Sequence, residues 1–186
     1  MSNFFSELLL LVGHSFITRL PTSNLEEAGM RIKKIARGGA RVSILKEFRV
    51  IREVENLRPG CIFIQIGGND IDSNLGLEVV RVIISNVGNY IDKVLDLGVR
   101  LVIIGEVMQR HSCRAVTLEG YRYIRQRVNR GLIRLARKYK GKVKFASFGD
   151  FNNLDYFRQD KIHLNHEGYR IYCGKILGII RDSKLD

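Results

Sequence analysis

The sequence predicts an α/β fold in which an open, mostly parallel sheet of about five strands is covered by helices on both faces. Two observations carry this prediction. Short apolar runs, the size of buried strands, alternate along the whole chain with longer segments whose apolar residues recur at helical spacing. The 186 residues also contain only two prolines and no low-complexity tract, so we expect a single domain over residues 1–186.

The N-terminal half is expected to contain two strands and three helices. Its first apolar run, Leu8–Gly13, is continuous, which is typical of a strand buried on both faces of a sheet. Apolar residues at roughly helical spacing predict a helix over Asn24–Arg37, although Gly29 lies within it. In chain order we expect a strand over Leu8–Gly13, a short helix from near Ser15 to before Pro21, a helix over Asn24–Arg37, a short strand over Arg41–Leu45 and an amphipathic helix over Lys46–Leu57.

The C-terminal half is expected to contain three strands and three helices. The clearest strand is Cys61–Ile66, an apolar run that ends in Gly67-Gly68. The long helix Leu77–Leu97 is followed by Gly98, a residue type favoured just past a helix end. The remaining elements are strands over Val99–Ile104 and Lys142–Ala146, a helix over Leu118–Tyr139 and a last helix from Asn165 or His166 to about Ile180.

The chain is strongly basic. It has 31 lysines and arginines against 19 aspartates and glutamates, a formal net charge of +12. Such a balance favours an anionic partner, which would be nucleic acid, an acidic membrane face or an acidic substrate. A solvated basic surface without a partner is the alternative, and composition does not separate the two.

The helix expected over Leu118–Tyr139 concentrates this charge. No acidic residue occurs from Gly120 to Gly149. At 100° per residue four arginines form a stripe apart from the apolar face, namely Arg127, Arg130, Arg134 and Arg137. The stripe is either the solvated side of a packed helix or a contact for a phosphate backbone or an anionic membrane surface, which would be sensitive to salt.

Several features indicate an intracellular, cytoplasmic protein. Residues Met1–Gly13 lack the pattern of a signal peptide, because no positive charge precedes the apolar run. No stretch reaches the roughly 18 apolar residues of a transmembrane segment. The three cysteines, Cys61, Cys113 and Cys173, are widely spaced and have no metal-ligand pattern, which fits a reducing compartment. We expect no metal and no cofactor.

Residues with chemical potential follow the expected strands. Ser15, Gly38-Gly39, Asn69 and the loop Gln109-Arg110-His111 all lie just after, or near, a strand end. In open parallel sheets the functional site lies beyond the carboxyl ends of the strands. We therefore expect these loops to converge on one edge of the sheet.

The residues at this edge, together with a later loop, fit a serine hydrolase. A serine nucleophile needs a base to accept its proton and a group that orients the base. His163 is the expected base, and Asp160 is three residues away, close enough to accept from the imidazole. Donors for an oxyanion would be the backbone N–H groups of Ser15 and Gly39 and the side-chain amide of Asn69.

Simpler explanations exist for each of these residues. Ser15 could serve only as a helix cap, since serine is favoured there. Asn69-Asp70 alone could form a turn. His14, His111 and His166 compete with His163 for the role of base. The motif around Ser15 is also not the Gly-x-Ser-x-Gly elbow of α/β-hydrolases, because Ile17 stands where the second glycine belongs.

Taken together, four short blocks resemble those of the SGNH, or GDSL-type, hydrolases. Their order and spacing match over nearly the whole chain, and the blocks are Gly13-His14-Ser15, Gly38-Gly39, Gly67-Gly68-Asn69-Asp70 and Asp160-Lys161-Ile162-His163. The resemblance implies a flavodoxin-like three-layer α/β/α sandwich, no metal, and esterase or lipase chemistry on an ester or lipid substrate.

The resemblance also assigns roles to residues. It implies that Ser15 is the nucleophile and an oxyanion donor, that His163 is the base, and that Asp160 orients it. Gly39 and Asn69 would complete the oxyanion hole, with Gly38 as the alternative to Gly39. The sequence departs from the family at His14, where aspartate is usual, which changes the charge and hydrogen bonding beside the serine.

A narrower likeness connects the chain to the esterase domain of LINE-type retrotransposon first-open-reading-frame proteins. It implies a role beside nucleic-acid-binding modules. The alternative to an active esterase is therefore an SGNH-fold module, weakly active or inactive, that binds RNA or DNA through its basic surface.

Overall fold

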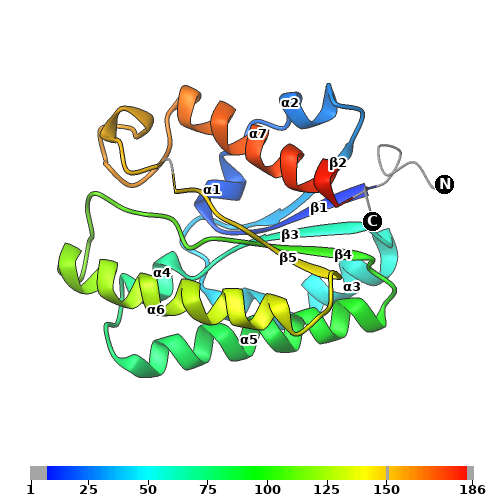
Figure 1. Ribbon diagram of the computed structural model, residues 1–186, viewed down its shortest axis with the longest axis horizontal. Helices are drawn as coiled ribbons and strands as arrows, with labels where there is room; N and C mark the ends of the chain where they lie inside the picture. Colours follow the sequence, from blue (N-terminus) through cyan, green and yellow to red (C-terminus); the bar gives the residue numbers. More distant parts are fainter. Residues whose placement is uncertain (1–7, 150, 184–186) are drawn as a thin grey trace.

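The computed structural model describes residues 8–149 and 151–183. Five strands form one sheet in the order β2-β1-β3-β4-β5, and every neighbouring pair is parallel (Figure 1). The strands are β1 (Leu8–Gly13), β2 (Arg31–Ala36), β3 (Cys61–Gln65), β4 (Leu101–Gly105) and β5 (Val143–Ala146). The predicted α/β class with a five-stranded parallel sheet is confirmed.

Helices cover both faces of this sheet (Figure 1). Successive side chains of a strand point to opposite faces, so Leu10 and Val12 of β1 pack into one apolar cluster while Leu9 and Leu11 pack into the other. The first cluster includes η2 (Val42–Lys46), α3 (Phe48–Leu57), α5 (Leu77–Asp96) and α6 (Leu118–Arg137), and the second includes α1 (Ser15–Thr18), α2 (Ser23–Glu26) and α7 (His166–Asp182). Two further short helices, α4 (Gly68–Ile71) and η3 (Leu154–Tyr156), lie in loops.

The helix predicted over Asn24–Arg37 is wrong. Only residues 24–26, the last three of α2, are helical there, and Gly29 adopts a left-handed conformation with φ +84° that ends the helical path. The chain then enters β2, which pairs with β1 alone and is an edge strand. Its lysines and arginine lie on a largely solvated strand. The strand therefore lacks a continuous apolar run, and its apolar residues at 32, 35 and 36 happen to match the spacing of a helix.

The short strand predicted over Arg41–Leu45 is also wrong. The segment forms the 3₁₀ helix η2, whose apolar side chains at 42, 44 and 45 are buried in the first cluster. The Val42 N–H donates to the carboxylate of Asp70, at 3.1 and 3.0 Å to its two oxygens. A donor held by this side chain is not available to pair with a neighbouring strand.

The structure tests only part of the expectations about membrane spans and the signal peptide. Among residues 8–149 and 151–183, no helix has the length and apolar character needed to span a bilayer. Residues 1–7, on which the expectation of no signal peptide partly rests, lie outside the described residues. Cys61, Cys113 and Cys173 are free thiols, and Cys61 and Cys173 are buried.

Candidate active site

Ser15 lies at the carboxyl end of β1, where α1 begins. Gly13 permits this position, because a Cβ on Gly13 would collide with the carbonyl oxygen of Gln65 in the adjacent strand β3. As the first residue of α1, Ser15 has a backbone N–H that makes no helical hydrogen bond. The serine is half-buried, so its hydroxyl remains accessible.

Asp160 and His163 occupy a tight loop that precedes α7. The Asp160 Oδ1 atom accepts from the backbone N–H groups of Ile162 and His163, at 3.0 and 2.9 Å. Lys161 between them adopts a left-handed conformation with φ +57°. This conformation folds the loop back so that the two catalytic candidates face each other.

The three side chains form a continuous chain of hydrogen bonds. Asp160 Oδ2 lies 2.6 Å from His163 Nδ1, and His163 Nε2 lies 2.9 Å from Ser15 Oγ. Partial burial opposes the charge on Asp160, but hydrogen bonds from the His163 ring and from two backbone N–H groups lower the pKa of Asp160 to about 2. An ionised Asp160 accepts the Nδ1 proton, which leaves Nε2 free to accept from Ser15.

His14 does not compete for the role of base. It is buried, and its Nδ1 accepts from the Phe16 N–H at 3.4 Å, which caps α1. Burial, followed by the charges of Arg110 and His163, lowers the pKa of His14 to about 3. A neutral imidazole therefore provides the helix-capping acceptor that the usual aspartate could provide, without adding a negative charge beside Ser15.

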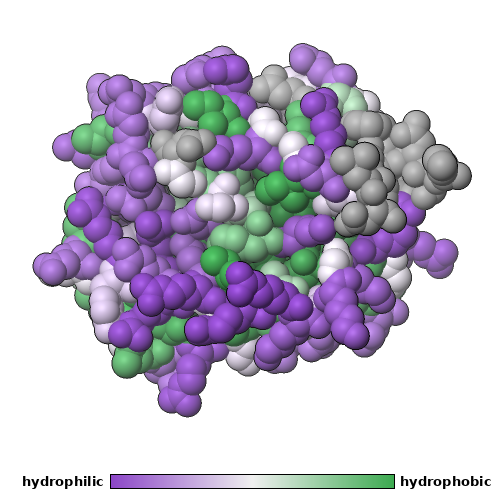
Figure 2. All heavy atoms as spheres, viewed as in Figure 1, coloured by the Kyte–Doolittle hydropathy of each residue, from purple (hydrophilic) through white to green (hydrophobic). Residues whose placement is uncertain are grey.

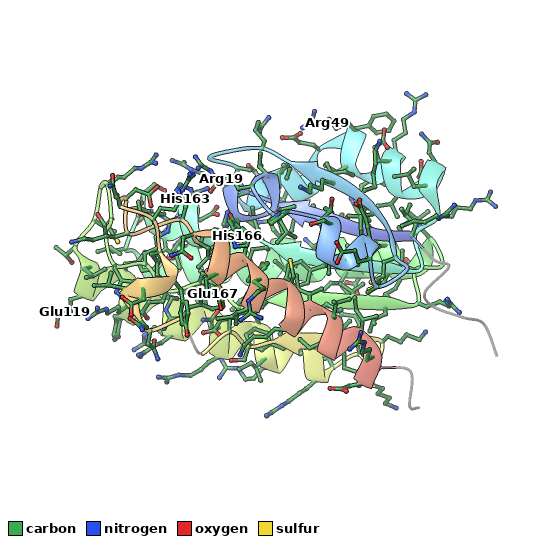
Figure 3. The ribbon with its side chains drawn as sticks, turned by 90° about the horizontal axis from the view of Figure 1, so that it is seen from above. Arg19, Arg49, Glu119, His163, His166 and Glu167 are labelled. Carbon is green, nitrogen blue, oxygen red and sulfur yellow. The ribbon has the colours of Figure 1, made fainter. Side chains whose placement is uncertain are left out.

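Within the described residues, the hydrogen bond to the Ser15 hydroxyl comes from His163 and not from the two other histidines. The His111 ring packs edge-on against Phe157, with ring centroids 4.8 Å apart. Its backbone N–H donates to the Lys161 carbonyl at 2.9 Å, which ties the loop after β4 to the loop that carries His163. His166 is exposed and is the first residue of α7, and Figure 3 labels it with His163 and Arg19.

The predicted oxyanion donors line one cavity with Ser15 and His163, about 240 Å³ in volume. Gly39 is the third residue of a turn closed by the bond from the Ala40 N–H to the Arg37 carbonyl, and its φ of +74° suits glycine there. Within the part of the chain that the structure describes, the Gly39 N–H donates to no protein acceptor. Gly38, the alternative donor, lines the same cavity.

The Asn69 side chain is held from both ends. Its Nδ2 donates to the Ala40 carbonyl at 2.9 Å, and its Oδ1 accepts from Arg110 Nη2 at 2.8 Å. The amide orientation is thus fixed, and one Nδ2 hydrogen is left for a ligand in the cavity. Arg110 is itself anchored by a buried ion pair in which its Nη1 lies 2.7 Å from Asp72 Oδ2.

Asp70 braces the loop that carries Gly39. Both of its carboxylate oxygens accept from the Val42 N–H at the start of η2. Burial raises the pKa of Asp70 to about 6, against the opposing effects of its backbone hydrogen bonds and of Arg41. Asn69 and Asp70 therefore hold the Gly38–Val42 segment from one side through three hydrogen bonds.

Sequence reasoning did not assign roles to the arginines of this cavity. Arg19, Arg110 and Arg114 all line it. Arg110 was visible only as part of a loop expected near a strand end. Its bonds to Asn69 and Asp72 span about 40 residues of sequence, so no local pattern indicates them.

The four arginines of the predicted stripe lie elsewhere and are exposed on α6. Arg127, Arg130 and Arg134 line a groove of about 430 Å³ with residues of α5, including Arg81. Arg137 continues the stripe toward the end of α6, and the Arg127 guanidinium stacks on the Tyr123 ring, 4.4 Å from its centroid. Hydrophilic side chains cover much of the face on which α5 and α6 lie (Figure 2).

Comparison with known proteins identifies a family whose model matches this chain and several solved structures with a similar fold. The model of the GDSL-like lipase/acylhydrolase family matches residues 13–171. Similar solved structures include a GDSL-like lipase from Bacteroides thetaiotaomicron, at 19% identity and TM-score 0.76, covering 96% of this chain and 89% of that one. A psychrotrophic esterase from Pseudoalteromonas has 12% identity and TM-score 0.71, with coverage of 97% and 100%. A carbohydrate esterase of family 3 from Talaromyces cellulolyticus has 17% identity and TM-score 0.76, with coverage of 97% and 99%. No curated protein matches by sequence.

Proposed function

This chain belongs to the GDSL-like lipase/acylhydrolase family, and from that premise we propose that it is a serine esterase that hydrolyses carboxylic esters. Ser15 is the nucleophile, His163 the general base and Asp160 the group that orients and stabilises the imidazolium. The observation that carries the proposal is the unbroken hydrogen-bond chain from Asp160 through His163 to Ser15 Oγ.

The reaction follows from this arrangement. Ser15 Oγ attacks the ester carbonyl carbon while His163 Nε2 accepts the hydroxyl proton. The tetrahedral intermediate collapses to an acyl-serine, and the imidazolium returns the proton to the departing alcohol oxygen. A water molecule, deprotonated by His163, then attacks the acyl carbon, and the carboxylic acid leaves as Ser15 regains its proton.

The negative oxygen of the intermediate needs donors fixed in advance. We assign this role to the N–H groups of Ser15 and Gly39 and to Asn69 Nδ2, which share one cavity. Each such donor typically contributes about 10²–10³ in turnover. Arg110 is a positioning residue: it holds Asn69 Oδ1, and its charge polarises the amide so that Nδ2 is a stronger donor.

The size of the cavity favours a short acyl group. At about 240 Å³ it is smaller than the usual range of about 300–1,000 Å³ for pockets that enclose drug-sized ligands. Ile162 is its one large aliphatic lining residue among those described. The cavity thus offers little apolar surface for a long acyl chain.

The proposal is tested with 4-nitrophenyl acetate. The wild-type protein should release 4-nitrophenol, and Ser15→Ala should lower kcat by at least about 10³-fold. Ser85→Ala is the matched control, because Ser85 is exposed on α5 and away from the cavity. Turnover by the wild-type protein that is no faster than that of Ser15→Ala would overturn the proposal.

A further inference from the structure

The cavity at Ser15 is lined by positive charge. Among the described residues, its nine lining residues include Arg19, Arg110 and Arg114 but no aspartate or glutamate. Arg110 positions Asn69, but hydrolysis of an uncharged ester gives no role to Arg19 and Arg114. These arginines therefore indicate that the substrate carries a group that binds guanidinium.

The three arginines differ in how they are engaged. Arg110 is buried and already bound to Asp72 and Asn69. Arg19 and Arg114 are exposed at the mouth of the cavity, and in the described ranges neither guanidinium has an ion-pair or hydrogen-bond partner. These two groups are therefore free to bind an anion from outside.

Both free arginines stand on anchored backbone. The Arg19 N–H donates to the Ser15 carbonyl at 3.0 Å, which places Arg19 at the end of the short helix that begins with the nucleophile. The Arg114 N–H donates to Asp72 Oδ1 at 3.0 Å, and the same carboxylate also binds the Arg110 guanidinium. Figure 3 labels Arg19 close to His163 and far from Arg49. The two side chains thus extend from fixed points beside the triad.

Resting on the proposed function, we propose that the substrate is an ester carrying a carboxylate or phosphate group, which Arg19 and Arg114 bind while Ser15 attacks the ester carbonyl. Guanidinium groups bind both anions through paired N–H donors, and two of them on one rim fix the anion in position as well as attract it. Binding of the anion beside the triad raises the affinity of the site for the ester. The scarcity of apolar lining agrees with a small charged substrate.

A matched pair of substrates measures how a negative charge on the ester affects its hydrolysis. In 4-acetoxybenzoate and 4-acetoxybenzamide the same acetyl ester is para to either a carboxylate or an uncharged amide of similar size. After correction for their rates of uncatalysed hydrolysis, kcat/KM should be at least about tenfold higher for the benzoate at low ionic strength. Added salt should reduce the advantage of the benzoate and leave the benzamide unchanged.

Substitutions of Arg19 and Arg114 test whether these two residues cause the preference for the charged ester. Arg19→Gln and Arg114→Gln should each raise KM for 4-acetoxybenzoate about fivefold while kcat stays the same, because binding of a remote group is lost equally from substrate and transition state. The double variant should hydrolyse both esters at equal corrected rates. Arg19→Lys, which keeps the charge, should retain part of the preference. Arg52→Gln, an exposed arginine of α3, is the control and should change nothing.

The outcomes separate this inference from the proposed function. Equal corrected rates for the two esters in the wild-type protein, or a preference that survives the double variant, would overturn the anionic substrate class and leave the esterase proposal intact. Failure of both esters to react faster than with Ser15→Ala would overturn both. A preference for 4-acetoxyphenyl phosphate as well as the benzoate, lost in the double variant, supports the proposal with phosphate as the anion.

Discussion

At the scale of single residues, His14 shows how the site tolerates a departure from its family. The usual aspartate beside Ser15, the proposed nucleophile, is replaced by a buried ring that accepts a hydrogen bond from Phe16 N–H and carries no charge. Arg110 and His163 both disfavour a proton on His14. The capping acceptor is kept, and residue 14 adds no negative charge beside Ser15.

The lowered pKa of His14 makes the stability of the protein depend on pH. The pKa of His14 is about 3 in the folded protein and about 6.5 when exposed, so between these values the unfolded chain binds a proton that the native protein does not. The free energy of unfolding should therefore decrease as pH falls from about 6.5 toward 3. Urea unfolding at several pH values should show a shallower decrease for His14→Asn, which can still cap α1 and cannot titrate.

Asp70 has a pKa raised to about 6 by burial and acts in the opposite direction over an overlapping range, but it is present in both proteins. The comparison between His14→Asn and wild type therefore cancels its contribution. Identical pH dependence of the two proteins would show that His14 is not held neutral by the fold.

At the scale of elements, the loop between β2 and η2 places the Gly39 N–H in the cavity. It is fixed by a turn at one end and by Asn69 and Asp70 at the other. The geometry of the proposed oxyanion hole thus depends on contacts between the loops after two different strands, β2 and β3.

The two neighbouring glycines of this loop give a matched test. Gly39→Ala places a side chain at φ +74°, which costs about 1–2 kcal/mol, although nothing lies within 4 Å of the added Cβ. We expect lower stability by that amount and a lower kcat, because relaxation of the backbone moves the N–H. Gly38→Ala, at a position without positive φ and also without neighbours within 4 Å, should change both little.

Chemical denaturation and ester hydrolysis measure the two effects. If the kcat of Gly38→Ala fell while that of Gly39→Ala did not, Gly38 would be the donor instead.

The elements also show which features could be predicted from sequence. The strands β1, β3 and β4 are fully or almost fully buried, and their continuous apolar runs were recognised. The edge strand β2 was not recognised from the sequence. It pairs with one strand only and one side of it is solvated, so it contains lysines and an arginine where buried strands have apolar residues. Ser15, Asn69 and His163, which line one cavity, could be singled out from the sequence because each belongs to a short local motif.

The engagement of Arg110 by Asn69 and Asp72 could not be predicted in the same way. Neither local spacing nor periodicity records a contact between loops that follow different strands. Such contacts depend on the order of strands in the sheet, which the apolar pattern does not specify.

At the scale of the whole molecule, the sheet order explains why one cavity receives so many loops. Strand β1 lies between β2 and β3, and connections on its two sides leave in opposite directions. This reversal is the place where open parallel sheets form ligand sites. Ser15 follows β1, Gly39 follows β2, Asn69 follows β3 and Arg110 follows β4, so four loops meet there.

The basic stripe of α6 is a second feature at this scale, and it shares no lining residue with the cavity at Ser15. We propose that its exposed guanidinium groups bind the phosphate backbone of single-stranded RNA. Mobility-shift titrations should show affinity that falls steeply with salt and weakens in Arg130→Gln/Arg134→Gln. Esterase activity should be unchanged in that variant, and salt-independent or negligible binding at low salt would contradict the proposal.

The central claim is that Ser15 is a nucleophile activated by His163, and covalent labelling tests it most directly. Diethyl 4-nitrophenyl phosphate should add one diethylphosphoryl group to the intact protein, and peptide mapping by mass spectrometry should locate it on Ser15. Labelling should be absent in Ser15→Ala and strongly slowed in His163→Ala, since the base is needed to remove the hydroxyl proton. An unlabelled wild-type protein, or a label on another residue that persists in Ser15→Ala, would contradict the account.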